Sequence, residues 1–264
     1  MLEIETFVAV VVGSGLCVAV GYFIEQRRGR PPQAARTVLF NVACFVPASF
    51  LQGLLSPLIA GVTVLAVNAI GGGAIILPSR GWGLLVGAVA YLVAMDGMEY
   101  LFHRAQHKLP LLWSMHALHH SDADFNVSTT IRHFWADRLL KMATVYLICG
   151  CLFRVSPAVL TIYGIFSYYN YVLHLDVGLA FGRWSWLLNA PRYHRLHHSR
   201  VPGDENCNFA ALLPIFDVLS GAYRRPRPGE HPPTGLADEP GPASVLEALA
   251  WPLRGLFGRR LKEA

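Results

Sequence analysis

The sequence predicts an all-α integral membrane protein with about four to five transmembrane helices and a histidine-rich helical cap. Three observations support this class. First, 53% of the 264 residues are apolar and only 15% are charged, which is unusual for a soluble protein. Second, several long runs carry no charge, and about 20 apolar residues cross roughly 30 Å of hydrocarbon as a helix. Third, most of the eleven histidines fall in short clusters.

The first membrane element is expected between Thr6 and Ile24, a run of 19 residues without a charge. Glu3 and Glu5 precede it where a secretory signal would carry basic residues, and no small-residue cleavage site follows. We therefore interpret the run as a retained anchor. The following loop carries four arginines, so the positive-inside rule places it in the cytoplasm and the N-terminus outside. Anchor and loop together form a predicted unit, residues 1–36.

The second element is expected in residues 37–79, a run of 43 residues without a charge or a histidine. The run contains Pro47, Pro57 and a glycine triplet that begins at Gly71. We predict one crossing followed by a short re-entrant or interfacial piece, with two crossings as the alternative. The choice matters, because each additional crossing moves everything downstream to the other side of the membrane.

Three further apolar spans are expected: 81–103, 139–153 and 155–173. The last two form a helical hairpin that is broken at Arg154. Spans that run in the same direction end at the same face, so His103 and His174 are expected to meet there, with Arg154 at the opposite face. Basic residues near the histidines favour a cytoplasmic location for this face, which requires that the 43-residue run cross only once.

The region after the last histidine cluster is expected to lie outside the bilayer. Residues 204–223 mix polar and apolar side chains and are predicted to cover the cytoplasmic face as part of the cap. Residues 224–264 are predicted to form a mobile tail, because its first part is rich in Pro, Gly and charge. An amphipathic surface helix is expected within it, over 246–261. The central domain is therefore 37–223.

Charge and cysteine content exclude other classes. The net charge of +5 is spread over short loops, so we expect membrane lipids, and no nucleic acid, as partners. The five cysteines include no C-x-x-C pair and are predicted to be reduced and mostly buried. Richness in Ala, Gly, Pro and Arg is typical of a GC-rich bacterial gene, and no organelle signal is visible. The expected location is the bacterial inner membrane.

Nine histidines occur at spacings that suit metal ligands. His103 and His107 are four residues apart and share one face of a helix. The pattern H-x-x-H-H begins at His116 and again at His194, and one helical turn of this pattern can present three imidazoles. His174 ends a predicted span at the level of these clusters. The nine candidate ligands are His103, His107, His116, His119, His120, His174, His194, His197 and His198.

Nine imidazoles exceed the three or four protein ligands that one zinc ion takes, so two metal ions are predicted. Imidazole suits zinc, copper, nickel and iron alike, and ligand type alone does not choose the metal. The H-E-x-x-H pattern of zinc metalloproteases is absent. His133 lies near the clusters but outside their spacing, so its role stays open. Asp96 is a candidate acceptor that would hold a metal-bound imidazole in one tautomer; the alternative is a helix-end carboxylate in water.

Three stretches carry a resemblance to a known family. They are D-G-M-E-Y-L-F-H-R-A-Q-H from Asp96, M-H-A-L-H-H-S-D from Met115 and Y-H-R-L-H-H-S from Tyr193. Together they resemble the HxxxH, HxxHH and HxxHH boxes of the fatty acid hydroxylase/sterol desaturase superfamily of membrane di-iron oxygenases, over roughly residues 90–223. The three-residue gap in the first box is similar to the sterol-desaturase branch. The family often has F-H-P-x-E where this chain has H-F-W-A-D after Arg132, so the resemblance gives His133 no ligand role.

The resemblance implies that the nine histidines hold two iron ions, which zinc can replace in a purified protein. The implied reaction is O2-dependent hydroxylation or desaturation of a lipid C–H bond. Sterol-like or hopanoid-like lipids, alkyl lipids, carotenoids and acyl chains remain alternative substrates. Electrons are expected from an external donor, ferredoxin-type or cytochrome-type with its reductase, because the chain has no flavin or nicotinamide fingerprint. Candidate hydrogen-bond partners of the metal ligands are Asp96, Glu99, Asn170, Asn208 and Asp217.

The alternative function is a histidine-rich membrane protein that binds or transports metal without oxygenase activity. A transporter would need polar residues along a path through the midplane of the bilayer. Here the spans are filled by Val, Leu, Ala and Gly, and the histidines gather at one face. Membrane zinc hydrolysis is a lesser alternative, which differs from oxygenation in needing neither O2 nor a reductant.

Overall fold

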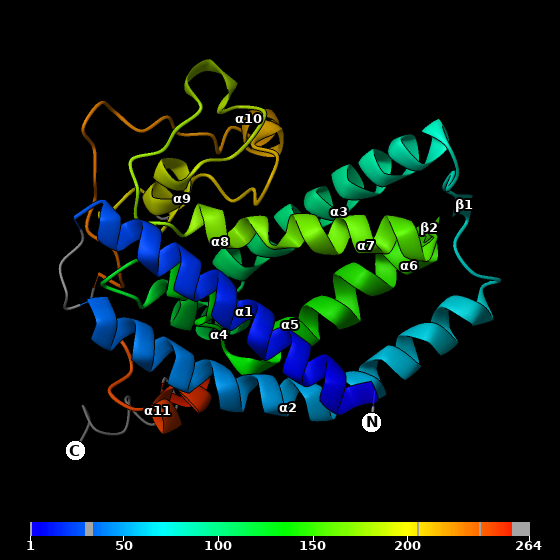
Figure 1. Cartoon of the computed structure of the whole chain (residues 1–264), viewed down its shortest axis with the longest axis horizontal. Coiled ribbons are helices and arrows are strands. Elements are labelled where there is room, and N and C mark those ends of the chain that lie inside the picture. Colours follow the sequence, from blue (N-terminus) through cyan, green and yellow to red (C-terminus); the bar gives the residue numbers. More distant parts are fainter. Residues whose placement is uncertain (1, 30–33, 205, 238, 255–264) are drawn as a thin grey trace.

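The protein is described here by a computed structural model of residues 2–29, 34–204, 206–237 and 239–254. Its architecture is helical, with three long helices that extend away from a cap of short helices and loops (Figure 1). The helices are α1 (Leu2–Arg27), α2 (Ala34–Ala69), α3 (Trp82–Lys108), α4 (Pro110–His120), η1 (Val127–Ile131), α5 (Trp135–Lys141), η2 (Met142–Tyr146), α6 (Leu147–Leu152), α7 (Pro157–Ser167), α8 (Tyr169–Leu173), η3 (Gly182–Trp184), α9 (Pro191–His197), α10 (Ile215–Ser220), α11 (Val245–Leu249) and η4 (Trp251–Leu253). The strands are β1 (Ile75–Ile76) and β2 (Phe153–Arg154), paired in parallel.

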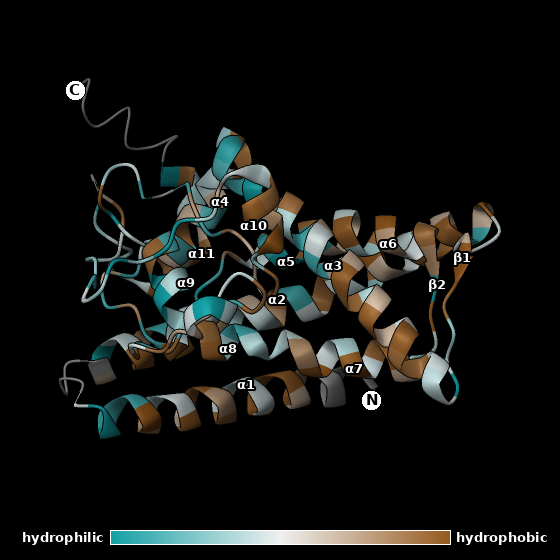
Figure 2. Cartoon of the chain, turned by 90° about the horizontal axis from the view of Figure 1, so that it is seen from above, coloured by the Kyte–Doolittle hydropathy of each residue, from teal (hydrophilic) through white to brown (hydrophobic). Residues whose placement is uncertain are grey.

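Three helices are long and apolar enough to cross a membrane: Phe7–Arg27 of α1, Ala35–Ala69 of α2 and Trp82–Lys108 of α3. Their outer faces expose large aliphatic side chains, such as Leu16, Leu39 and Leu65. In Figure 2 the hydrophobic colour dominates these helices and the hydrophilic colour gathers around the cap. This distribution is expected for a helix bundle whose apolar outer faces contact lipid and whose cap contacts water.

The 43-residue apolar run forms one continuous helix over most of its length. α2 extends from Ala34 to Ala69 and includes both Pro47 and Pro57. The expected interfacial piece is a turn followed by β1, so neither a re-entrant helix nor a second crossing is present in this run. A helix of this length spans about 54 Å, more than a bilayer core. Figure 1 shows that it bends along its course, as internal prolines promote.

The predicted hairpin of residues 139–173 is present, but each arm is divided. α5, the π-helical turn η2 and α6 make the first arm, and α7 and α8 make the second. The break lies where it was predicted: Ser156 caps α7 through its side chain and Pro157 occupies the first turn. Among the described residues, three helices rather than four to five therefore have the length and hydropathy of an uninterrupted membrane span.

The end of the molecule opposite the cap is closed by β1 and β2. Ile75 pairs with Phe153, and the guanidinium of Arg154 donates to the carbonyl of Gly71 at 2.9 Å. A Cβ at Gly73 would lie 2.2 Å from the carbonyl carbon of Phe153, so this close approach requires glycine. The expected position of Arg154, away from the histidines, is confirmed.

Buried polar side chains attach α1 and α2 to the cap. Glu25 at the end of α1 accepts hydrogen bonds from the backbone N–H groups of Val127 and Asp176, at 2.9 and 2.8 Å. Asn41 of α2 donates to Asp122 at 2.9 Å. Both Glu25 and Asn41 are fully buried. These contacts set the position of the cap relative to the membrane helices.

The predicted mobile tail instead packs against the cap as far as the structure describes it. Thr234 is buried and pairs with Ser199 in a β-bridge. Trp251 is 4% exposed and belongs to an apolar cluster with Met115 and Phe134. The first part of the expected helix over 246–261 is divided into α11 and η4, and residues 255–264 lie outside the described part. Burial of a few apolar side chains overrides the loop-like composition.

Candidate metal centre

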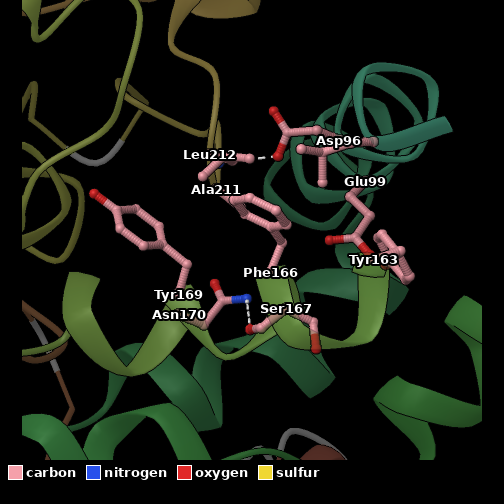
Figure 3. A pocket seen from close by; sticks show the side chains of 10 residues that line it. Asp96, Glu99, Tyr163, Phe166, Ser167, Tyr169, Asn170, Ala211 and Leu212 are labelled. Carbon is pink, nitrogen blue, oxygen red and sulfur yellow. Dashed lines mark hydrogen bonds between the residues drawn. The ribbon is translucent and has the colours of Figure 1, made fainter. Parts of the chain in front are cut away.

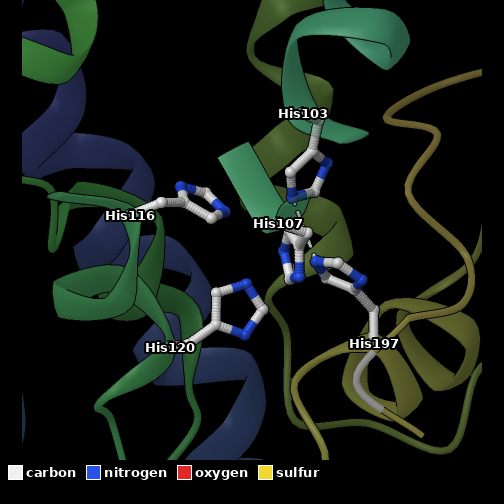
Figure 4. A group of neighbouring side chains, drawn as sticks. All are labelled: His103, His107, His116, His120 and His197. Carbon is white, nitrogen blue, oxygen red and sulfur yellow. Dashed lines mark hydrogen bonds between the residues drawn. The ribbon is translucent and has the colours of Figure 1, made fainter. Parts of the chain in front are cut away.

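The nine predicted histidines converge into two groups. Within each group, one nitrogen of every ring lies within 4.8 Å of the corresponding nitrogens of the others. The first cluster, drawn in Figure 4, is His103, His107, His116, His120 and His197. The second cluster is His119, His174, His194 and His198. A third candidate group, His116, His133 and Asp137, shares His116 with the first cluster.

Each H-x-x-H-H pattern is divided between the clusters. On α4, His116 and His120 contribute to the first cluster, whereas His119 contributes to the second. On α9 the division is reversed, because only His197 belongs to the first cluster. Rings four residues apart share a helix face, and the intervening i+3 ring points to the neighbouring face. One turn therefore presents three imidazoles, and the structure divides them between the two clusters.

Backbone carbonyl groups define the tautomers of three rings. His103 Nδ1 lies 2.7 Å from the carbonyl oxygen of Phe209, and His197 Nδ1 lies 2.8 Å from that of Cys207. His174 Nδ1 lies 2.7 Å from the carbonyl oxygen of Asn170. A carbonyl oxygen only accepts, so Nδ1 carries the proton in each ring and Nε2 keeps its lone pair.

These lone pairs point at other imidazole nitrogens. His103 Nε2 and His197 Nε2 are 3.0 Å apart, and neither of the two atoms carries a proton. Two lone pairs at this distance repel each other unless a cation lies within reach of both. Ligand nitrogens around one metal ion, each about 2.0–2.1 Å from it, are themselves about 3 Å apart. The donor set therefore fits a metal ion.

The second cluster has the same spacing. His174 Nε2 lies 3.2 Å from His119 Nε2 and 3.1 Å from His194 Nε2.

Ring nitrogens of His116, His120 and His198 are buried without a hydrogen-bond partner among the described residues. Buried polar atoms rarely lack a partner, and coordination to a metal would satisfy them.

Burial keeps the cap histidines neutral. It lowers the pKa of His116, His119 and His120 on α4 below the ordinary value of 6.5. It likewise lowers the pKa of His194 and His197 on α9 and of His198 directly after it. Only a neutral imidazole offers a lone pair to a metal ion, so these rings are ready to ligate at neutral pH.

Two carboxylates shape the loop that holds the first cluster. Asp217 accepts from the backbone N–H groups of Phe209 and Ala210 at 2.8 and 2.9 Å, and burial raises its pKa to about 6. Asp96 accepts from Leu212 and Leu213 at 2.9 Å each. Asp96 therefore contacts backbone rather than an imidazole, contrary to prediction. Asp217 acts on His103 indirectly: it binds the backbone N–H of Phe209, and the carbonyl of Phe209 accepts from the His103 ring.

The remaining predicted partners also act away from the imidazoles. Asn170 serves through its backbone carbonyl, while its side chain donates to Ser167. Asn208 has a positive φ of 53°. Its side-chain amide nitrogen donates to the backbone carbonyl of Arg224, and its amide oxygen accepts from the backbone N–H of Arg224. Glu99 binds Lys141 at 2.8 Å and accepts from the Tyr163 hydroxyl. None of these three side chains forms a hydrogen bond or ion pair with a clustered imidazole in the part of the chain that the structure describes.

The structure adds Asp137, which the sequence reasoning missed. Its carboxylate lies 3.6 Å from Nδ1 of both His116 and His133, and Gln106 donates to it at 3.2 Å. Burial alone would raise the pKa of Asp137, but the two histidines outweigh burial and leave it below its usual value. His133 is outside both clusters and stacks on His119 with ring centres 4.2 Å apart. The i,i+4 spacing of His133 and Asp137 was the available signal.

A large cavity adjoins both clusters. Its volume is about 620 Å³, within the usual range for ligand pockets. His103 and His116 of the first cluster face it, as do all members of the second cluster except His198. Its other walls come from α1, α2, α5 and α7, with Val10 and Phe45 among the apolar lining residues.

A small pocket lies between α3, α7 and residues 211–212 (Figure 3). It measures about 30 Å³, space for a water molecule rather than a lipid. Phe166, Asp96 and Ser167 are among the side chains that line it (Figure 3). Glu99 and Tyr163 line both this pocket and the large cavity, so the two spaces share one wall.

Comparisons with known proteins agree with this geometry. The sequence model of the family described as fatty acid hydroxylase matches residues 88–222, about half of the chain. Alkylglycerol monooxygenase of Xenopus tropicalis is 30% identical over 132 residues, which are 50% of this chain and 29% of that protein. Ornithine lipid hydroxylase OlsE of Rhizobium tropici is 32% identical over 145 residues, which are 55% of this chain and 44% of that protein.

A more distant relative is the very-long-chain aldehyde decarbonylase GL1-6 of Oryza sativa subsp. indica, 25% identical over 150 residues, which are 53% of this chain and 23% of that protein. The chain spans less than half the length of these curated relatives. No solved structure matches it. The matched region contains all nine clustered histidines and both carboxylates that support the loop.

Proposed function

This chain belongs to the fatty acid hydroxylase family, and from that premise we propose that it is an O2-dependent membrane oxygenase that hydroxylates or desaturates a lipid C–H bond. In this proposal two iron ions occupy the two histidine clusters. The observation that carries the proposal is the approach of His103 Nε2 to His197 Nε2 at 3.0 Å with both lone pairs directed inward. Iron at such a centre supplies the O2 and one-electron chemistry that side chains lack.

The chain's own residues bind and orient. Nε2 of His103, His174 and His197 faces the metal positions because a backbone carbonyl holds each Nδ1–H. The clustered rings of α4 and α9 are buried, which limits the access of water. The cavity brings a bound molecule against both clusters. No protein acid or base is needed for this role, since the side chains supply ligation and position.

The substrate is proposed to be a lipid with a long alkyl chain. The cavity runs between helices that are themselves apolar and lipid-facing, so a substrate can enter from the bilayer. The relatives are named for alkylglycerols and ornithine lipids, which favours alkyl and acyl lipids over sterols, hopanoids and carotenoids. An external electron donor, ferredoxin-type or cytochrome-type with its reductase, completes the proposed system.

The proposed location is the bacterial inner membrane with the histidine centre facing the cytoplasm. α1 and α3 both end at the cap, and α2 runs back toward β1 (Figure 1). With the N-terminus outside, this order places the cap inside. An impermeant thiol reagent should label a Ser79→Cys variant in intact cells, and should label Arg200→Cys only after permeabilisation. The reverse pattern would contradict the orientation.

The function is tested by turnover in membranes that contain the full chain. We expect lipid oxidation that requires both O2 and a reductant. His119→Ala and His197→Ala should each abolish this oxidation and reduce the bound iron. His231→Ala, whose side chain is 61% exposed, is the control and should behave as wild type. Turnover without O2 would indicate hydrolysis instead. Metal uptake into vesicles without lipid oxidation would indicate the transport alternative.

A further inference from the structure

The large cavity contains charges that a purely apolar substrate would not require. Four of its lining residues have acidic or basic side chains: Glu99, Asp137, Arg138 and Lys141. Charge enclosed between apolar helices is costly unless it is paired. The partners of these four groups therefore indicate what the cavity is built to hold.

Three of the four charges are paired within the chain. Lys141 Nζ lies 2.8 Å from Glu99, which also accepts from the Tyr163 hydroxyl. Asp137 is held by two imidazoles and by Gln106. Arg138, in contrast, lines the cavity with an exposed side chain that forms no hydrogen bond or ion pair with any residue that the structure describes. One basic side chain that lines the cavity therefore has no anionic partner among the described residues and is open to an anion that enters the cavity.

Arg138 lines the same cavity as members of both histidine clusters. Arg138 directly follows Asp137, whose carboxylate is 3.6 Å from His116. Glu99, the partner of Lys141, precedes His103 by one turn of α3, a rise of about 6 Å. The apolar wall formed by Val10, Phe45 and Ala48 belongs to α1 and α2 instead. The cavity is therefore amphipathic, and its charged part adjoins the candidate metal centre.

We propose that Arg138, with Lys141 held nearby by Glu99, binds the anionic headgroup of the lipid that occupies this cavity. The inference rests on the proposed function and narrows its substrate class to lipids with a phosphate or carboxylate close to the oxidised end. A guanidinium presents a planar set of donors that matches either anion. A sterol, a hopanoid or a carotenoid would leave Arg138 unpaired.

The test is equilibrium binding to the purified full chain, which does not depend on turnover. The probes are hexadecyl phosphate, palmitate and hexadecan-1-ol, which share an alkyl chain and differ in headgroup. We expect tighter binding of the two anions than of the alcohol. Arg138→Gln should weaken anion binding by roughly tenfold, as loss of a charge-assisted hydrogen bond predicts, and should leave binding of the alcohol unchanged. Arg138→Lys should restore part of the affinity.

Arg200→Gln is the matched control, because Arg200 is exposed on the cap outside the cavity. Equal affinities for the three probes, or equal losses in Arg138→Gln and Arg200→Gln, would overturn the inference even if the chain oxidises lipids. Anion binding that depends on Arg138 in a protein that oxidises no lipid would support the inference and refute the proposed function. Comparison of the phosphate and carboxylate probes identifies the preferred anion.

Discussion

The two histidine clusters contain the same kind of ligand but are supported differently. In the first cluster, His103 and His197 depend on carbonyl groups of the loop 207–213, which is distant in sequence from α3. In the second cluster, His174 depends on Asn170 of its own short helix α8. The first cluster is thus supported by tertiary contacts and the second, in part, by local ones. Identical side chains can therefore differ in how a remote substitution affects them.

The largest effect is expected from removing adjacent ligands of different clusters. His197→Ala should cost up to one metal ion per chain from the first cluster, and His198→Ala up to one from the second, because each variant removes one imidazole from the group around that metal position. The double variant should lose both. Metal content of the purified proteins measures this. A double variant that loses no more than either single variant would mean that the clusters form one site.

Acid should affect both clusters equally, because burial lowers the pKa of cap histidines in each. Their unfolded-state pKa is near 6.5, so below that pH the unfolded chain takes up protons that the folded chain excludes. The free energy of unfolding of chelator-treated protein should therefore fall as pH falls, by about 1.4 kcal/mol per pH unit for each neutral ring. Thermal melting at about pH 7.5 and pH 5.5 checks the sign; equal melting temperatures would contradict it.

A substitution in the supporting loop should separate the clusters. The two carboxylate oxygens of Asp217 accept from the N–H groups of Phe209 and Ala210. Asp217→Asn replaces one of these oxygens with an NH2 group that cannot accept, which should displace the loop and weaken metal binding at the first cluster by about 10–100-fold. Asp96→Asn is the matched control. Asp96 accepts from the backbone N–H groups of Leu212 and Leu213, and the carbonyl groups of these two residues accept no hydrogen bond from a clustered histidine in the described part of the chain. Metal loss to a competing chelator measures the difference. Equal metal loss in the two variants would show that the loop acts as one unit.

The smallest effect on metal binding is expected from a packing change in α1, which contributes no histidine to either cluster. A Cβ at Gly21 would lie 2.4 Å from Val127 Cγ2, so Gly21→Ala should destabilise the fold by about 1–3 kcal/mol through overpacking. Metal content should stay unchanged in both clusters. Gly15→Ala is the control, because a Cβ there meets nothing within 4 Å. Selective metal loss from one cluster in Gly21→Ala would show that α1 supports that cluster directly.

The features determined by local sequence were predictable. Hydropathy over about 20 residues marks α1, α2 and α3, because crossing a bilayer depends on a contiguous segment. The break before Pro157 follows from the fixed backbone of proline and the capping serine before it. Eight of the nine clustered histidines were identifiable by i,i+3 and i,i+4 spacing, since helix geometry places such residues on adjacent faces, and His174 was identifiable by its position at the end of a predicted span.

Other features depended on contacts between distant segments. The division of each H-x-x-H-H pattern between two clusters follows from how α3, α4, α8 and α9 approach one another. The attachment of Asp96 to Leu212 and Leu213 joins residues more than a hundred positions apart. The packing of Trp251 against Met115 orders a segment whose composition predicted mobility.

The physical reason is the same in these cases. A side chain's spacing determines which face of its helix it occupies, and this is a property of the local sequence. Whether that face meets a metal position, a backbone amide or an apolar neighbour is determined by the free energy of the whole packed assembly. For this protein, the sequence alone determined which residues could ligate, and only the tertiary structure decided which ligand serves which cluster.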